Sequence, residues 1–115
     1  MSGNSPGSTG RQATIGVLVS IIGKKVVLSP FFAKAEGLMI IDCESHTSSF
    51  ETNPEKTSDA TRSLILRSGT RRLICGFITT RDRNWLNVKG IDTRLGTCSS
   101  PVGSLIEDYD NLPAA

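Results

Sequence analysis

The sequence has little of what nucleic-acid binding or histidine-based catalysis requires. Its 115 residues include one Trp, one Tyr and one His, and the formal net charge is only +2. Nucleic-acid binding usually needs a basic surface and aromatic side chains on which bases stack. The lone histidine, His46, lies in a polar stretch and makes a poor general base. We therefore expect no nucleic-acid partner and a protein that is not an enzyme.

Long hydrophobic runs and paired cysteines are also missing. No apolar run approaches the ~20 residues that span a bilayer, so we expect no membrane partner. Residues 1–12, rich in Ser, Gly and Thr, predict a disordered tail and lack the apolar region of a secretory signal. The three cysteines form no Cys-x-x-Cys pair, which fits a reducing compartment. These features together predict a cytoplasmic protein.

The first half of the remaining chain has the pattern of an antiparallel sheet. The run TIGVLVS at 14–20 is apolar on both pleat faces, which is typical of a central strand. A short strand with paired lysines follows at 24–28 and predicts a sheet edge. GLMIID at 37–42 predicts a third, buried strand, and HTSSFET at 46–52 predicts the return arm of a hairpin.

The second half alternates between helical and strand periods. Ser58 and Gly69 are the predicted ends of one helix, and Thr80 and Gly90 those of another. Strands are expected at 71–78 and 91–95, and Ser99 or Ser100, followed by Pro101, predicts the start of a last helix. The prediction is a single α/β domain over residues 13–112, with a mixed sheet of about five strands and helices on both faces.

Several motifs in this order resemble a known family. SPFFAKAEGLMIID at 29–42 is similar to the Ser-Pro-His-Phe-Gly-Arg-Ala turn and following strand of the dinitrogenase iron–molybdenum cofactor-binding family, which includes NifX-like carriers and the C-terminal domain of NifB-like proteins. LNVKGID at 86–92 resembles the family's Leu-x-x-x-Gly-Ile ending. The resemblance covers roughly residues 14–110 and implies a ribonuclease H-like motif.

The resemblance implies a small, non-enzymatic carrier or accessory protein of nitrogenase-cofactor assembly. Its cargo would be an iron–molybdenum or iron–sulfur cluster, and its partners other nitrogenase-assembly proteins or metalloenzymes. Two positions depart from the family pattern: Phe31 replaces the histidine that is the proposed cluster ligand, and Ala33 replaces a glycine. The family also has a glycine-rich loop after the strand that corresponds to RRLICGFI at 71–78. In this chain the matching segment, GFITTRD, keeps only Gly76.

The predicted cluster site lies between three loops. Its residues are Phe31, Lys34, Thr79, Arg81, Cys98 and Ser99. Lys34, Arg81 and Arg83 could attract an anionic cluster, although charged loop residues are more often simply solvated. Any cluster bound here must use a ligand other than Phe31, because a phenyl ring has no lone pair to donate.

Each cysteine has a functional and a structural interpretation. Cys98 precedes a predicted helix N-terminus, which lowers the pKa of a nearby thiol, so it is the candidate metal ligand; Ser, Pro and Gly around it also make an ordinary cap. Cys75 lies in an apolar strand and is expected in the core. Cys43 and His46 form a Cys-x-x-His half-site, which is incidental unless other ligands join it.

Other classes of function remain open. A protein-interaction module that keeps the fold without binding a cluster is the main alternative, and a thiol redox protein acting through Cys98 is the third. Ribonuclease H-like nucleases need carboxylates on the first central strand to hold two metal ions. The strand at 14–20 has none, so we exclude a nuclease.

Overall fold

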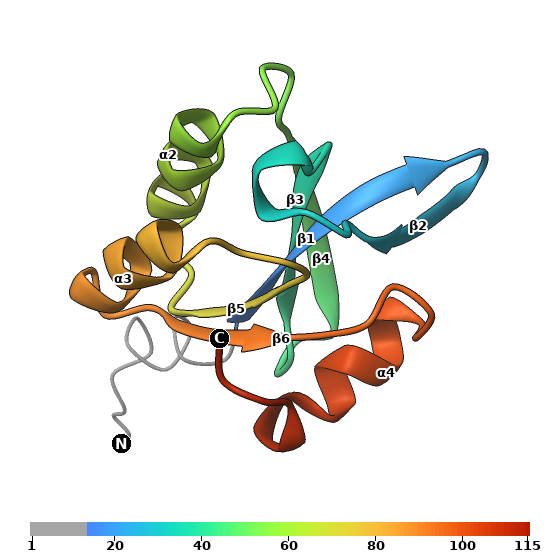
Figure 1. Cartoon of the computed structure of the whole chain (residues 1–115). Helices are drawn as coiled ribbons and strands as arrows, with labels where there is room; N and C mark the ends of the chain where they lie inside the picture. Colours follow the sequence, from blue (N-terminus) through green and yellow to red (C-terminus); the bar gives the residue numbers. More distant parts are fainter. Residues whose placement is uncertain (1–13) are drawn as a thin grey trace.

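The computed structural model describes residues 14–115, which form one α/β domain (Figure 1). The strands are β1 (Thr14–Ile22), β2 (Lys25–Leu28), β3 (Gly37–Asp42), β4 (Thr47–Thr52), β5 (Arg72–Cys75) and β6 (Asp92–Leu95). The helices are α2 (Ser58–Ser68), α3 (Thr80–Val88) and α4 (Val102–Glu107), and the short 3-10 helices are η1 (Phe32–Lys34) and η2 (Tyr109–Asn111). The expected disordered tail, residues 1–12, lies outside the described residues.

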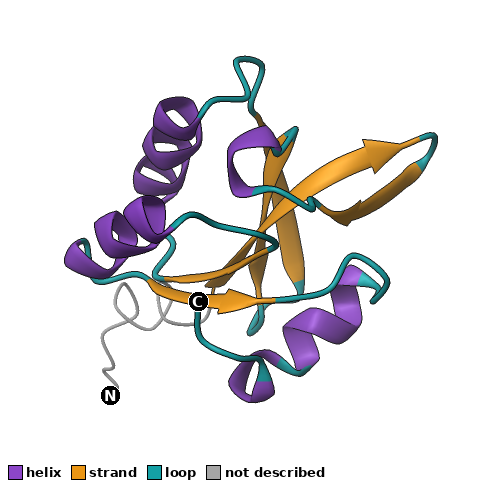
Figure 2. Cartoon of the chain, in the orientation of Figure 1, coloured by secondary structure: helices purple, strands orange, loops and turns teal. Residues whose placement is uncertain are grey.

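The strands form one mixed sheet in the order β4-β3-β1-β5-β6. β1 is antiparallel to β3 from Thr14 to Val19 and parallel to β5 at Gly16 and Val17. From Val19 to Ile22, β1 pairs with β2 in a hairpin that projects from the body of the molecule (Figure 2). The mixed sheet and its central first strand are confirmed; the sheet has six strands where about five were expected.

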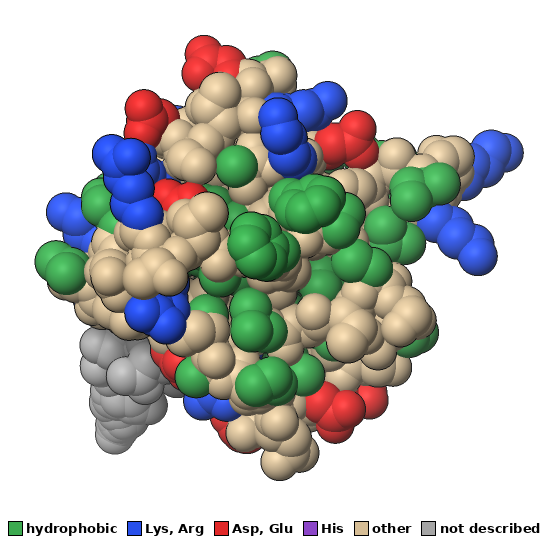
Figure 3. All heavy atoms as spheres, in the orientation of Figure 1, with side chains coloured by type: hydrophobic (Ala, Val, Ile, Leu, Met, Phe, Trp, Pro, Cys, Tyr) green, Lys and Arg blue, Asp and Glu red, His purple; other side chains and the backbone are tan. Residues whose placement is uncertain are grey.

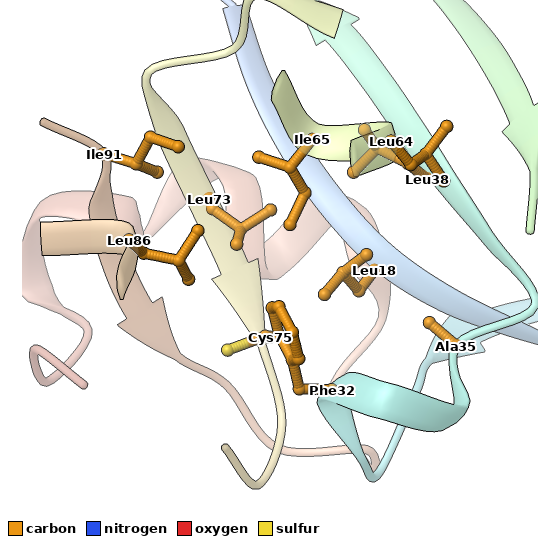
Figure 4. Close-up of a cluster of buried hydrophobic side chains, with 10 residues drawn as sticks. All are labelled: Leu18, Phe32, Ala35, Leu38, Leu64, Ile65, Leu73, Cys75, Leu86 and Ile91. Atoms are coloured by element: carbon orange, nitrogen blue, oxygen red, sulfur yellow. The ribbon is translucent and has the colours of Figure 1, made fainter. Parts of the chain in front are cut away.

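Helices cover both faces of the sheet, as predicted. On one face α2 and α3 pack over a cluster of buried side chains from the sheet, η1 and the helices, shown in Figure 4: Leu18, Phe32, Ala35, Leu38, Leu64, Ile65, Leu73, Cys75, Leu86 and Ile91. On the other face α4 and η2 cover Ile15, Val17, Val19, Leu28 and Ile74 with Leu105 and Tyr109. Because β1 contributes to both clusters, its apolar side chains are needed on both pleat faces.

The helices begin one or more residues away from the predicted caps. α2 is capped by Thr57 instead of Ser58: the Thr57 side chain accepts a hydrogen bond from the Ala60 N–H at 3.1 Å. α3 is capped in the same way by Thr79 instead of Thr80. The last helix starts at Val102 with no side-chain cap bond. Threonine next to a second polar residue makes either one a plausible cap, so the sequence alone misplaces it by one residue.

The chain ends by covering one edge of the sheet. Leu95 N–H donates to the Pro113 carbonyl at 2.8 Å, and Ala115 N–H donates to the Thr93 carbonyl at 2.9 Å. Residues 113–115 therefore lie along the outer side of β6, beyond the predicted domain end at 112. Among the described residues, no helix is long and apolar enough to cross a membrane.

Candidate functional site

The turn at 29–35 directs two neighbouring phenylalanines to opposite environments. Phe31 has extended backbone angles, with φ −130° and ψ 131°, and Phe32 begins the helix η1. Phe32 is 2% exposed and its ring enters the cluster between Cys75 and Leu18 (Figure 4). Phe31 is 52% exposed. Phe32 is therefore part of the core, whereas Phe31 lies on the open surface.

Backbone hydrogen bonds join this turn to the loop after β5. Phe32 N–H donates to the Phe77 carbonyl and Phe77 N–H to the Pro30 carbonyl, both at 2.8 Å, which makes a parallel bridge between Phe31 and Phe77. Gly76 permits this approach, because a Cβ there would lie 2.5 Å from the Ser29 oxygen and 2.7 Å from the Pro30 oxygen. Gly76 therefore has a steric role in this chain.

The bridge brings two exposed aromatic rings together. Phe31 and Phe77 have ring centroids 6.2 Å apart at an interplanar angle of 74°, an edge-to-face arrangement. Phe77 is 64% exposed. Figure 3 shows hydrophobic side chains gathered on this face, over the region of the turn and of the loop after β5. We call Phe31 and Phe77 the aromatic pair.

Phe77 is a site residue that the sequence argument missed. It was expected at the end of a strand over 71–78, but β5 stops at Cys75. The strand is shorter because the backbone at Gly76 and Phe77 turns to pair with Pro30 and Phe32. A glycine inside a strand pattern, which often marks a close backbone approach, was the available signal.

Thr79 and Arg81 lie where the N-termini of α2 and α3 meet. They line a depression of about 460 Å³ together with Thr57, Ser58, Asp59, Arg62 and Asp82. Asp82 is 3% exposed, and its Oδ2 accepts hydrogen bonds from the hydroxyls of Ser58 at 3.1 Å and Thr79 at 3.2 Å. Arg62 lies 3.6 Å from Asp82 Oδ1. Asp82 therefore holds the two helix starts together, and Thr79 is first of all a structural residue.

Lys34 is exposed at the end of η1, three residues after Phe31. Its N–H donates to the Phe31 carbonyl at 3.1 Å, which keeps this turn compact. Arg81 is also exposed, four residues after Phe77. The structure thus brings one predicted cation to each of the two segments that carry the aromatic pair.

Cys98 and Ser99 belong to the third loop, which follows β6. Gly96 N–H donates to the Cys75 carbonyl at 3.0 Å, so this loop starts beside the end of β5. Thr97 Oγ1 then lies 3.2 Å from Ser99 Oγ and 3.0 Å from Ser100 Oγ. Cys98 is exposed, four residues before the helix begins at Val102. The hydroxyl contacts order the loop and leave the thiol accessible to solvent.

The other two cysteines have different environments. Cys75 is fully buried, and desolvation raises the pKa of its thiol to about 12, so its predicted place in the core is confirmed. Cys43 and His46 are exposed in the turn between β3 and β4. In that turn, backbone N–H groups of Ser45 and Glu44 bond the Asp42 carboxylate and lower its pKa.

Metal-ligand groups are sparse on this surface. Within residues 14–115, no set of three or more His, Cys, Asp or Glu side chains is placed to hold a metal ion. The candidate site offers one thiol, two cations and two aromatic rings. This set has fewer ligands than the coordination of a bare metal ion needs.

Two solved structures have a similar chain path. The apo form of the orange protein from Desulfovibrio gigas matches with a TM-score of 0.79 and 17% identity, over 90% of this chain and 93% of that one. An NMR structure of a NifB-like protein of the DUF35 family from Thermotoga matches with a TM-score of 0.67 and 19% identity, over 87% and 89% of the two chains. The chain shares the fold of these two proteins.

The likeness supports the fold implied by the resemblance in sequence. No protein-family model matches the sequence, and no curated protein matches it. At these identities the two neighbours establish the fold alone, so the role of each loop residue is argued from its own geometry.

Proposed function

We propose that this protein is a small, non-enzymatic carrier of a preformed, anionic iron–sulfur or iron–molybdenum cluster. One neighbour in fold is known in an apo form, and another is NifB-like, which supports a cofactor-carrier role. The cluster would rest on the aromatic pair, with Lys34, Arg81 and Cys98 around it. Other proteins of cofactor assembly would be the partners that load and unload it.

The observation that carries this proposal is the exposed aromatic pair at the loop edge of the sheet. Two exposed phenyl rings held by backbone hydrogen bonds form a preorganised apolar surface. The edge of an aromatic ring is electropositive, and rings make favourable contacts with sulfur. An anionic cluster with a sulfide-rich surface suits such rings, and Lys34 and Arg81 supply the opposite charge.

Binding of this kind is expected to be weak. Phe31 offers no ligand, and hydrogen bonds to charged groups contribute roughly 1.5–3 kcal/mol each. A carrier that must release its cargo benefits from such a loose association. Cys98 carries the one sulfur atom among the proposed site residues, and it would supply the direct bond to the cluster.

An anaerobic titration with extracted iron–molybdenum cofactor tests the proposal. We expect loose binding by the wild-type chain, tighter binding by Phe31→His, and loss of binding when Phe31 and Phe77 are both changed to Ala. Metal content after gel filtration and the visible spectrum are the measurements. Phe50→Ala, which changes an exposed phenylalanine on β4, is the control and should bind the cofactor as the wild type does.

The same aromatic pair favours one second candidate, a protein-interaction module. Exposed aromatic residues are frequent anchors of protein interfaces. If Phe31→His leaves cofactor binding unchanged and the double Ala variant also has no effect, the aromatic pair is not a cluster site. The interaction module then becomes the better description of this surface.

A further inference from the structure

The edges of the sheet differ in how they are covered. Within residues 14–115, the outer side of β6 is bonded to the C-terminal residues 113–115. β2 has only four residues, and Lys24 and Lys25 lie at the tip of its hairpin. β4 has neither kind of protection: it is the terminal strand, and the described residues place no other segment in register with its outer side.

β4 also has the features of a strand that can accept another strand. It runs for six residues in one-to-one register with β3, without a bulge, a proline or a lysine. Natural proteins use those devices to prevent pairing at open edges. All six side chains of β4 are exposed, and its only charged residue is Glu51.

Phe50, at the centre of this edge, is held in a fixed position. Its ring covers Gly37 on β3: a Cβ on that glycine would lie 2.8 Å from Phe50 Cε1. An aromatic ring over a glycine of the adjacent strand stabilises a sheet edge. The ring remains 40% exposed, so it offers apolar surface at the rim of the sheet.

We propose that β4 pairs with β4 of a second copy, antiparallel and with Phe50 on the two-fold axis, so that two sheets become one. In this register Phe50 faces Phe50, and Glu51 faces Ser49 of the other copy, so no like charges are opposed. The opposed positions of this edge therefore include an apolar pair at the axis and no pair of like charges.

Sedimentation equilibrium of the wild-type chain over a wide concentration range tests the association. With rising protein concentration, the average molar mass should increase from that of one chain to that of two. Phe50→Lys places two cations opposite each other on the axis and should abolish the rise. Phe77→Lys makes the same exchange at an exposed phenylalanine outside β4 and should leave the rise in mass unchanged. A wild-type chain that stays monomeric at every concentration overturns the proposal.

A cysteine cross-link tests the register and does not depend on the folding of the Lys variant. In a Cys43→Ser, Cys98→Ser background, Phe50→Cys places two thiols on directly opposed residues, whose Cα atoms lie about 4.5–5.5 Å apart. That separation permits a disulfide, so oxidised glutathione should join the two chains and be reduced to two glutathione thiols.

Ser48→Cys, on the same strand and face, is the matched control. In the proposed register its two copies are four residues apart along the strands, roughly 13 Å, and should not join. Cross-linking of the Ser48 variant as fast as that of the Phe50 variant would overturn the proposed pairing. Neither the sedimentation measurement nor the cross-linking measurement involves a cluster. Their results are therefore independent of the proposed carrier function.

Discussion

Phe31 and Phe32 differ in environment because the backbone changes from an extended residue to a helical turn between them. The buried Phe32 ring fills space between β1 and β5, whereas the Phe31 ring contacts an exposed ring. Adjacent residues of one type therefore have separate roles: one stabilises the fold, and the other belongs to the candidate site.

Alanine substitutions should separate these roles. Phe32→Ala removes a fully buried ring and is expected to lower the free energy of unfolding by about 3–5 kcal/mol. Phe31→Ala removes a half-exposed ring and should cost less than about 1 kcal/mol. Urea unfolding of both variants measures the difference. Equal losses would mean that Phe31 is part of the core.

The cysteines should differ in reactivity in the folded protein. Cys43 and Cys98 are exposed, whereas Cys75 is buried and its pKa is about 12. The thiolate is the reactive form. At neutral pH iodoacetamide should modify Cys98 and Cys43 and leave Cys75 unmodified until the chain unfolds, as mass spectrometry of peptides would show. Equal rates at Cys98 and Cys75 would remove the reason for considering Cys98 a ligand.

The buried thiol of Cys75 also makes stability depend on alkaline pH. Burial raises its pKa from the ordinary value of 9.0 to about 12 in the folded protein. The unfolded chain loses this proton first, so stability should fall as pH rises from about 9 towards 12. Cys75→Ala removes that contribution, and its unfolding free energy should fall less steeply over this range. Denaturant midpoints at several pH values provide the comparison.

At the scale of elements, the position of the loop after β5 depends on Gly76, whose backbone lies against the turn at 29–35. Gly76→Ala would press a methyl group against the carbonyls of Ser29 and Pro30. We expect a loss of about 1–3 kcal/mol and separation of the aromatic pair. A Cβ at Gly103 meets nothing within 4 Å, and the residue lies in α4, so Gly103→Ala should be neutral or slightly stabilising. Thermal unfolding of both variants tests this contrast.

The elements themselves follow largely from local sequence. Apolar runs identify β1, β3 and β5, and Gly69 ends α2 with a left-handed φ of 74°, as its position predicts. The caps of α2 and α3 were placed one residue late, since two adjacent hydroxyl residues compete there. Gly76 was the one local signal for the true end of β5, whose position is set by Phe77 pairing with a turn more than forty residues earlier.

Contacts between residues far apart in sequence also limited the prediction of the candidate site. Phe31, Lys34, Arg81 and Cys98 were identified as loop residues, and the side chains of all four are exposed. Phe77 was missed, because its exposure results from long-range backbone pairing and not from its neighbours in sequence. Thr79, also predicted at the cluster site, caps α3 and donates a hydrogen bond to Asp82.

At the scale of the whole molecule, Arg94 connects β6 with the C-terminal segment. Its guanidinium donates to the carbonyls of Tyr109 and Asp110 at 3.2 Å and of Leu112 at 3.1 Å. It also lies over the Tyr109 ring, with 4.9 Å between Cζ and the ring centre. Arg94 therefore adds side-chain contacts to the backbone hydrogen bonds that hold residues 113–115 to the sheet.

Arg94→Ala should release that segment. We expect a lower free energy of unfolding, because several hydrogen bonds to a charged group are removed together. Amide exchange at Leu95 and Ala115 should accelerate at the same time. Arg81→Ala removes an exposed arginine and should change neither quantity. Unchanged exchange in Arg94→Ala would show that the segment is held by its backbone bonds alone.

The pairing of β1 with β5 has a consequence for biosynthesis. β1 and β3 are close in sequence and can pair early, but the other side of β1 is covered by residues 73 and 74. A ribosome makes the chain from its N-terminus, so the most apolar strand keeps one bare side until about two thirds of the protein has emerged. During that interval the nascent chain is most exposed to aggregation, and a chaperone that shields β1 would improve its yield.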